Sequence, residues 1–513
     1  MSRFNLIDEK WIPVRFLNGT RGELGIIDTL LRSKEIAAIE DQSPLVVAAL
    51  HRFLLAVLYR ALEGPTDIDQ AKNLFTTGLP EDKIKAYLEK WRNRFWLFDE
   101  KYPFGQNPHV PEDEIEPWTK LTAEYNATSN KVLFDHTDTT NLCPVLPNKI
   151  ARWIISTLNF SVRGGRGYRP SPSSGALICI PKGNDLHQTM LLSLVPYPNR
   201  NVMEQDSALW ERNPNKLPLK VSERVPFGYA DLYTWQARLM RLIVGKNEEC
   251  TEVAFIPGIG YDHETSTFRD PMVPYRVGKK GVRQIEWEER GLWRSFSSLL
   301  PDVKSPEGLE PGVVNYLASL SLKRLITSSV TFNVIGQKFK NASVEFWRME
   351  CFRFPFVIDR PIKSEIDDML RLAENTRGAL EIAFKDTGKA LLTKTNRALM
   401  PDKWVAGNLK PGDVTKYLMS IGALSQFWSA LELHFHEILG EYALGRNPDD
   451  IRLQWLTHVR DALKTAWEQH VGSVSAGDAW AIRALVKAEC AVRDKEKELD
   501  KEIEKYKKQE VNQ

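Results

Sequence analysis

The spacing of apolar residues changes near residue 361 and divides the chain into two parts. Beyond this point apolar positions recur every three or four residues, which is the period of an amphipathic helix. The pattern predicts four long helices, at about 364–392, 412–444, 448–471 and 476–509. Because short breaks separate them, they predict an up-down four-helix bundle. We therefore predict two domains, a mixed domain over 1–360 and the bundle over 361–513.

The first part mixes short helical and strand patterns with long polar connections. Helical periodicity is found at 25–31, 44–62, 81–95 and 147–159, and strand patterns at 4–14, 325–335 and 344–356. The runs 176–180 and 191–195 fit either a strand or a buried helix. Segments rich in Pro, Gly and polar residues lie at 102–117, 125–141 and 258–281. The predicted fold class is α+β, with a large mixed N-terminal domain of loops and short sheets before the C-terminal four-helix bundle.

The segment 160–175, FSVRGGRGYRPSPSSG, has the composition best suited to binding a polyanion. It places three glycines and three arginines within seven positions, without an acid: Gly164, Gly165, Gly167, Arg163, Arg166 and Arg169. Glycine lets the main chain approach a ligand closely, and guanidinium groups suit phosphate. Pro170 and Pro172 oppose a helix directly after the glycines, which excludes a P-loop or a dinucleotide signature. Taken alone, the segment also fits a solvated surface turn.

Two further segments are basic. The connection between the strands 325–335 and 344–356 has the sequence GQKFKNAS, which predicts a basic hairpin tip from Gly336 to Asn341 that includes Lys338 and Lys340. The loop-rich region 258–281 contains Arg269, Arg276, Lys279 and Lys280. Ordinary polar turns have similar compositions, so neither segment identifies a function alone.

Composition limits the class of protein. The 513 residues are 42% hydrophobic and have a formal net charge of +2, so nucleic-acid binding has to be argued for each surface separately. The five cysteines include no CxxC pair, which indicates neither a zinc site nor a disulfide framework and fits a reducing cytoplasm. A secretory leader and an apolar run of about 18 residues are both missing, so no membrane partner is expected.

A metal-dependent enzyme is one alternative. Asp135, His136 and Asp138 could hold a metal ion, as in a nuclease or a nucleotidyl transferase. However, metal-assisted phosphoryl chemistry needs carboxylates that converge from several ordered elements. His434 and His436 are two residues apart and face different sides of a helix, which argues against a metal site in the bundle. We predict no catalytic residue, cofactor or metal. An inert helical adaptor is the second alternative.

Several motifs together resemble the CasA family, the large subunit of the type I-E CRISPR surveillance complex Cascade. The opening FNLIDEKWIPV, the glycine-rich segment near 165, the hairpin ending in Asn341-Ala342-Ser343 and the terminal bundle follow the order and spacing of that family. The resemblance covers essentially the whole chain. It implies a non-catalytic, cytoplasmic subunit that recognises the PAM, a short motif beside the target, in double-stranded DNA. It also implies that the subunit starts unwinding for the guide RNA and recruits the helicase-nuclease.

The resemblance also assigns roles to residues and identifies partners. It implies PAM minor-groove contacts by Arg163, Gly164, Gly165, Arg166 and Gly167. It implies a wedge formed by Lys340, Asn341 and Ala342, with asparagine where the family usually has glutamine. A loop with Asn130, Phe134 and His136 would dock near the 5′ end of the guide crRNA, and Arg269, Lys279, Lys280 and Lys338 would make further basic contacts. The family's lysine finger has no clear counterpart. The partners implied are the backbone and small Cascade subunits, the crRNA, the target DNA and the helicase-nuclease. Some relatives have paired zinc cysteines near Cys143 and Cys250, but the second member of each pair is missing here.

Overall fold

The structure is a computed structural model of the chain. It describes all residues except 1–2, 113–114, 126–134, 139–141, 166, 218, 220–221, 246–248, 263–265, 280, 301–308, 323, 327–328, 341–342, 356–361, 393–409, 411, 475–478 and 512–513. The chain forms two compact units. The N-terminal unit comprises 1–292 and 298–352, and the bundle unit comprises 293–297 and 353–513.

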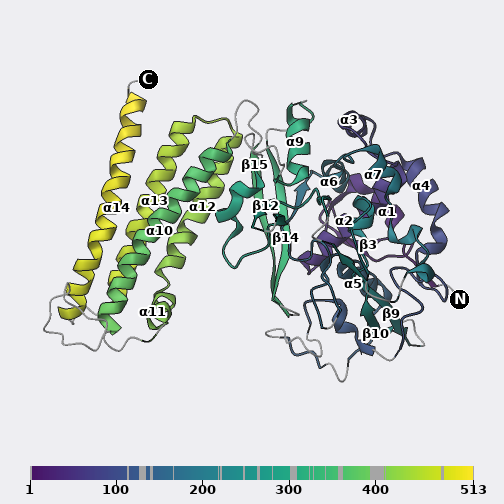
Figure 1. The fold of residues 1–513 in the computed structure, drawn as a ribbon. Helices are drawn as coiled ribbons and strands as arrows, with labels where there is room; N and C mark the ends of the chain where they lie inside the picture. The colour runs from purple at the N-terminus through teal and green to yellow at the C-terminus, as the bar shows by residue number, and fades with distance from the viewer. Residues whose placement is uncertain are drawn as a thin grey trace. The chain divides into compact units, whose positions relative to one another are not determined.

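The N-terminal unit combines short helices with small sheets (Figure 1). The strand orders are β1-β5, β3-β2-β4, β6-β10-β9, β8-β11, β12-β13 and β7-β14-β15, where the last residues of β15 belong to the bundle unit. Its helices are α1 (Ile26–Leu31), α2 (Pro44–Leu62), α3 (Ile68–Thr77), α4 (Glu81–Lys90), α5 (Pro147–Phe160), α6 (Leu186–Ser193), α7 (Arg200–Gln205), α8 (Tyr229–Tyr233) and α9 (Gly312–Leu322). Its strands are β1 (Arg3–Asn5), β2 (Ile12–Phe16), β3 (Arg21–Leu24), β4 (Ile36–Ile39), β5 (Trp96–Phe98), β6 (Ile115–Pro117), β7 (Ile178–Lys182), β8 (Ser222–Arg224), β9 (Arg238–Val244), β10 (Cys250–Pro257), β11 (Ile259–Tyr261), β12 (Tyr275–Gly278), β13 (Gly281–Gln284), β14 (Ser329–Lys340) and β15 (Ser343–Pro355).

Helix α2 forms the centre of this unit and is buried nearly all round. Ser43 caps its first turn by accepting a hydrogen bond from Val46 N, and Pro44 suits the first helical position. The helix packs against α4, α5, α8 and β14, which explains why it is apolar on every side. By length and composition α2 could cross a membrane, but 83% of that window is buried inside the protein, as in the core helix of a globular domain.

Acidification is expected to destabilise this core, because His51 of α2 has to stay neutral. Its Nδ1–H donates to Val47 O at 2.8 Å, and burial lowers the pKa of His51 from 6.5 to about 4. Between pH 6.5 and about 4 the unfolded chain binds a proton at His51 that the folded chain does not. The contribution of His51 to the free energy of unfolding is therefore fully present above pH 6.5 and is lost as the pH decreases below it. The loss is about 1.4 kcal/mol per pH unit, or about 2 kcal/mol at pH 5. Thermal unfolding from pH 7.5 to 5 should show a shallower pH dependence for His51→Gln than for the wild type, and equal slopes would exclude His51 as the cause.

The bundle unit is mainly helical and also contains 293–297 and the last residues of β15. Figure 1 shows α10, α12, α13 and α14 running alongside one another. They bury an apolar seam that includes Leu431, Phe435 and Ile438 of α12, and Trp455 Nε1 of α13 donates to Met369 O of α10 at 2.9 Å. The helices are α10 (Lys363–Leu392), α11 (Asp413–Ile421), α12 (Ala423–Ala443), α13 (Pro448–Ser473) and α14 (Ala479–Val511). The α+β fold class predicted from the sequence is confirmed.

Some predicted elements differ from the structure. The single strand predicted at 4–14 is wrong, because a turn separates β1 from β2 where Asn5 Oδ1 accepts from Ile7 N at 3.0 Å. The helix predicted at 412–444 is interrupted at Gly422, whose φ of 65° is left-handed. Strand β14 continues to Lys340, so Gly336 and Lys338 lie within the strand and not in the connection. The predicted domain boundary at 360–361 falls outside the described residues.

Candidate nucleic-acid interface

The segment 161–175, called the glycine–arginine loop below, follows directly after α5. Ser161 Oγ donates to Thr157 O at 2.7 Å and so continues the last turn of the helix. Ser171 N donates to Ser161 O at 2.9 Å, which closes the base of the loop. At its tip, Tyr168 N donates to Gly165 O at 3.2 Å and Gly164 N donates to Tyr168 O at 3.4 Å. Main-chain hydrogen bonds therefore hold the described residues of the loop at its base and at its tip.

The three predicted glycines serve different purposes. Gly167 has a φ of 86°, a left-handed conformation that glycine adopts without strain. At Gly164 a Cβ would lie 2.9 Å from Tyr168 Cβ, so a side chain would displace the tyrosine. Gly165 is exposed, and a Cβ there would meet no atom within 4 Å. The fold therefore requires glycine at 164 and 167, whereas at 165 glycine leaves main chain bare toward solvent. Arg166 lies outside the described residues.

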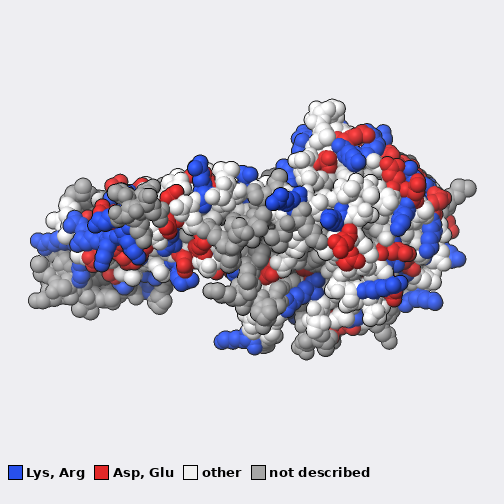
Figure 2. All heavy atoms as spheres, turned by 90° about the horizontal axis from the view of Figure 1, so that it is seen from above, with Lys and Arg blue, Asp and Glu red and all other residues white. Residues whose placement is uncertain are grey.

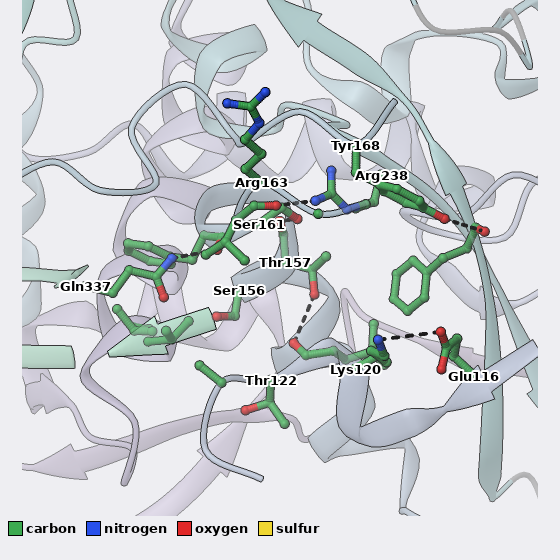
Figure 3. Close-up of a pocket in the computed structure, with 18 of the residues that line it drawn as sticks. Glu116, Lys120, Thr122, Ser156, Thr157, Ser161, Arg163, Tyr168, Arg238 and Gln337 are labelled. Carbon is green, nitrogen blue, oxygen red and sulfur yellow. Dashed lines mark hydrogen bonds and ion pairs between the residues drawn. The ribbon is translucent and has the colours of Figure 1, made fainter. Parts of the chain in front are cut away.

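Arg238 of β9 holds the loop in place (Figure 3). Its Nη1 donates to Arg169 O at 2.6 Å, its Nη2 donates to Val162 O, and the guanidinium lies 4.7 Å from the centre of the Tyr168 ring. Tyr168 OH in turn donates to Phe255 O of β10 at 3.0 Å. Burial lowers the pKa of Arg238 to about 10, so the group remains a cation at neutral pH. The loop is thus anchored to the β9–β10 sheet with a positive charge beneath it.

The described arginines of the loop are oriented differently. Arg163 is exposed, and Figure 3 shows its guanidinium pointing away from the anchored backbone. Arg169 forms an ion pair with Glu223 of β8 at 2.8 Å. Of these two described arginines, Arg163 is therefore the better placed to meet an anionic ligand, whereas Arg169 contacts the neighbouring strand β8.

The β14–β15 hairpin is the second predicted contact. Strand β14 pairs antiparallel with β7, and Lys340 is exposed at its end. At Gly336 a Cβ would lie 2.4 Å from both Ala176 O and Trp287 Nε1, so only glycine lets the strand pass here. Lys338 is partly buried, with Nζ 3.9 Å from a Glu286 carboxylate oxygen. Asn341 and Ala342, the predicted wedge residues, lie outside the described residues.

The structure brings the glycine–arginine loop and the β14–β15 hairpin together. Gln337 of β14 is 1% exposed, and its Nε2 donates at 2.7 Å to the carbonyl oxygen of Phe160, the last residue of α5 directly before the loop. At the end of the loop, a Cβ on Gly175 would lie 3.0 Å from the Phe339 ring. Both segments line a pocket of about 510 Å³ (Figure 3). Its lining includes Arg163, Gly164, Gly165, Tyr168, Gln337 and Val344.

The other predicted basic contacts lie apart from the described lining of this pocket. Arg269 has its guanidinium 5.6 Å from the centre of the Tyr275 ring, and Lys279 is exposed where β12 turns into β13. Lys280 is not described. Figure 2 shows Lys and Arg interspersed with Asp and Glu over the surface in view, in keeping with the low net charge. The case for nucleic-acid binding therefore depends on local geometry.

The predicted docking loop is only partly described. His136 is exposed, while Asn130 and Phe134 lie outside the described residues. Asp135 Oδ1 accepts from Thr137 Oγ1 at 2.7 Å and from Thr137 N at 3.2 Å, which closes a local turn. Within the described part of the chain, Asp135, His136 and Asp138 do not form a converging group of metal ligands. The geometry therefore does not favour the alternative of a metal-dependent nuclease.

Three residues of the site, Gln337, Arg238 and Tyr168, were not predicted from the sequence. Gln337 was assigned to a polar connection, although it follows a strand pattern closely enough to extend it. Arg238 begins the apolar run RLMRLIV, and a charged residue beside such a run is a weak signal of a buried contact. Tyr168 lies between two arginines, and nothing in that pattern indicates that its hydroxyl contacts β10.

Sequence comparison shows the class of this protein, which is CRISPR-associated. The family model described as CRISPR-associated protein Cse1 matches residues 5–466. The curated CRISPR-associated protein CasA/Cse1 of Thermus thermophilus is 33% identical over 485 residues, covering 91% of this chain and 92% of that protein. The chain belongs to the Cse1 family, which is also called CasA.

Solved structures agree with this assignment. A crystal structure of CasA from Thermus thermophilus has a TM-score of 0.81 at 29% identity, covering 97% of this chain and 100% of that chain. A chain of a CRISPR RNA-guided surveillance complex has a TM-score of 0.71 at 19% identity, covering 96% of this chain and 100% of that chain, and so shares the fold. The resemblance to the CasA family, inferred from the sequence, is confirmed.

Proposed function

We propose that this protein is the large subunit of a type I-E CRISPR RNA-guided surveillance complex. In this role it recognises the PAM in double-stranded DNA, starts the unwinding that forms the R-loop, and recruits the helicase-nuclease. One observation carries the proposal: the Gln337–Phe160 hydrogen bond joins an exposed glycine-rich loop to a lysine-tipped hairpin across 177 residues of sequence. The loop and the hairpin also line one pocket, which supports their acting together.

The glycine–arginine loop is the proposed PAM reader. The minor groove of B-DNA is about 6 Å wide, which favours bare main chain such as that at Gly165. Base pairs show a degenerate pattern in this groove, so recognition should tolerate several PAM sequences. Arg163, Arg166 and the basic segments at Lys279, Lys280 and Arg269 would contact phosphates, which makes affinity dependent on salt.

The tip of the β14–β15 hairpin is the proposed wedge. Separating the first base step below the PAM costs a few kcal/mol, which a side chain inserted into the stack can offset. Asn341 would enter the stack, while Lys340 and Lys338 contact the DNA backbone and Ala342 adds main-chain contacts. Because Gln337 fixes β14 to the loop, binding of the PAM would position the wedge. This is positioning and strand separation, and it requires no catalytic group.

The remaining segments are proposed to assemble the complex in the cytoplasm. The loop containing Asn130, Phe134 and His136 would dock near the 5′ end of the crRNA and contact the backbone subunits. The bundle unit would contact the small subunits. Copurification with the other subunits and a short RNA tests this assignment.

Replacing both Lys340 and Asn341 with alanine is expected to separate binding from opening. Lys340 ends β14 and has its side chain exposed, so the fold should tolerate the change. Duplex binding should persist because the glycine–arginine loop is intact. DNA opening should slow by at least about tenfold, because a loss of about 1.4 kcal/mol of wedge contacts in the transition state corresponds to that factor. Permanganate reactivity of the displaced strand, measured over time with the reconstituted complex, reports the opening rate.

Lys182→Ala provides the matched control. Lys182 is an exposed lysine of β7, in the same sheet, and pairs with Thr331 near the opposite end of β14 from Lys340. It should open DNA at the wild-type rate. A normal opening rate in the double variant would show that the hairpin tip is an ordinary polar turn.

A further inference from the structure

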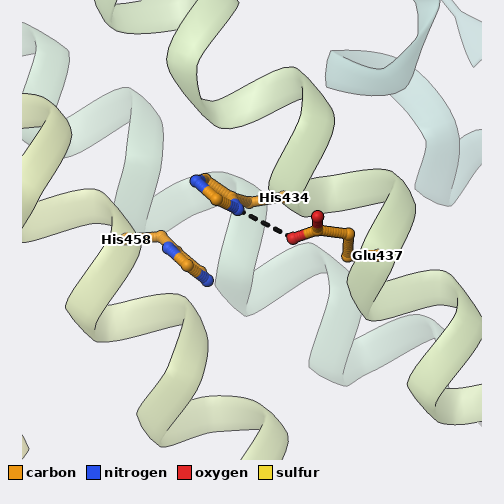
Figure 4. A group of neighbouring side chains, drawn as sticks. All are labelled: His434, Glu437 and His458. Carbon is orange, nitrogen blue, oxygen red and sulfur yellow. Dashed lines mark hydrogen bonds and ion pairs between the residues drawn. The ribbon is translucent and has the colours of Figure 1, made fainter.

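Two histidines and a glutamate lie together between helices α12 and α13 of the bundle unit (Figure 4). His434 and Glu437 are three residues apart on α12, so they share one face of that helix, and His458 comes from α13. The spacing of His434 and His436 argued against a metal site in the bundle, but the structure places a different histidine, His458 of the neighbouring helix, beside His434.

The three side chains are close enough to share one ligand. His434 Nδ1 lies 2.8 Å from Glu437 Oε2, and the two imidazole rings stack with their centres 3.5 Å apart and their planes 9° apart. One ligand atom from each of the three residues lies within 4.8 Å of the other two. The His434 and Glu437 side chains are 33% and 52% exposed, so an ion can reach them from solvent.

The cluster also has the charge that suits a cation. The Glu437 carboxylate lies directly beside the two imidazole rings, with Oε2 2.8 Å from His434 Nδ1. Its negative charge would partly neutralise a bound divalent cation, while the ring nitrogens supply neutral ligand atoms.

We infer that His434, Glu437 and His458 form a binding site for a divalent transition-metal ion of the zinc type. Two imidazole nitrogens and one carboxylate oxygen are a ligand set that suits Zn²⁺. The ion would take the position of the proton between His434 Nδ1 and Glu437 Oε2, with His458 as the third ligand. Water would complete the tetrahedron, as it does where a protein supplies three ligands.

Coordination requires a modest rearrangement. Zinc–nitrogen bonds of about 2.0–2.1 Å place tetrahedral ligands about 3.3 Å apart, so the farthest ligand atoms have to approach by at most about 1.5 Å. Stacked rings have parallel in-plane lone pairs, so one ring has to turn and leave the stack. Side-chain torsions of partly exposed residues allow this. Because its ligands come from two helices, the ion would clamp α12 to α13.

Zinc titration of the full-length, chelator-treated protein against a chromogenic competitor tests the site. We expect one saturable Zn²⁺ site in the wild type. Affinity should fall at least about 100-fold in His434→Gln and in His458→Gln, since even an outer ligand partner contributes 10–100-fold. His436→Gln is the matched control, on the same helix outside the cluster, and should bind as the wild type does. Circular dichroism should show all three variants folded, because the replaced side chains are partly exposed.

X-ray absorption at the zinc edge distinguishes this site from binding at the exposed Cys143, Cys351 and Cys490. The expected spectrum shows two imidazoles at about 2.0–2.1 Å and no sulfur. A sulfur scatterer at about 2.3 Å would overturn the inference. So would equal affinity in the wild type and His458→Gln, or no saturable binding in the wild type.

Discussion

Replacing Gly165 with aspartate is expected to lower affinity for PAM-bearing duplex by about 100-fold while leaving the protein folded. A Cβ at this position meets no atom within 4 Å, and the backbone of Gly165 is not left-handed, so the fold should tolerate the change. In the proposed complex, however, the carboxylate faces phosphates within a narrow groove. Juxtaposed like charges cost several kcal/mol, and 1.4 kcal/mol corresponds to a factor of ten. Fluorescence anisotropy of labelled duplex with the reconstituted complex measures the effect.

Two further variants make this result specific. Gly472→Asp introduces the same charge at an exposed glycine of α13 that also has no neighbour within 4 Å of a Cβ, and it should bind DNA normally. Gly165→Ser adds bulk without charge, so its intermediate affinity would separate the steric contribution from the electrostatic one. Wild-type affinity in Gly165→Asp would exclude this loop from the minor groove. Gly164 and Gly167 are unsuitable for such a test, because the fold itself requires glycine there.

The sequence predicted most of the helices because their apolar period is local information. The predicted helix 44–62 coincides with α2, and the helix 448–471 nearly coincides with α13. Errors arose where one residue overrides a periodic pattern. Gly422 adopts a left-handed conformation and divides a helix whose apolar spacing continues on both sides of it. Asn5 similarly ends a strand pattern by accepting a hydrogen bond from the main chain.

The two segments of the candidate interface could be predicted from the sequence, but the contact between them could not. Glycine and arginine content identified the loop, and basic residues identified the hairpin. Their junction depends on Gln337 donating to Phe160 O, and no local pattern indicates that pair. The metal-ligand cluster was missed for the same reason, because spacing along one helix does not show that His458 on the next helix faces His434.

The contact that buries the end of the glycine–arginine loop is also invisible in the sequence. Arg52 interrupts the apolar pattern of α2, and Asp270 lies in a segment that looked like a basic loop. The structure pairs these two residues with both side chains only 1% exposed. Ser173, at the end of the loop, donates to Asp270 Oδ2 at 2.7 Å, and Met272 N donates to Asp270 Oδ1 at 3.0 Å. One carboxylate therefore connects α2, the loop and the segment before β12.

Replacing Asp270 with alanine is expected to destabilise the N-terminal unit by about 3–5 kcal/mol, because it leaves the Arg52 guanidinium buried without its counter-ion. The Arg52 guanidinium also lies 4.5 Å from the centre of the Tyr233 ring, but an aromatic face cannot replace a full negative charge. Hydrogen exchange of α2, followed by mass spectrometry, measures the loss as a decrease in opening free energy. Hydrogen exchange within the bundle unit provides an internal reference, because it should not change. A single melting temperature would not distinguish the two units.

Asp8→Ala is the matched control, because Asp8 also pairs with an arginine, Arg92, but the two side chains are 52% and 35% exposed. Removing this pair should cost at most about 1 kcal/mol, since solvent screens exposed charges. Replacing both buried partners, with Arg52→Met and Asp270→Leu, should restore much of the stability, because no uncompensated charge is then buried. The same double variant still lacks the acceptor of Ser173. We therefore expect it to recover protection in α2 while exchange in the glycine–arginine loop stays faster than in the wild type. A loss below about 1 kcal/mol in Asp270→Ala would mean that water reaches the Arg52 charge and that this pair does not hold the loop.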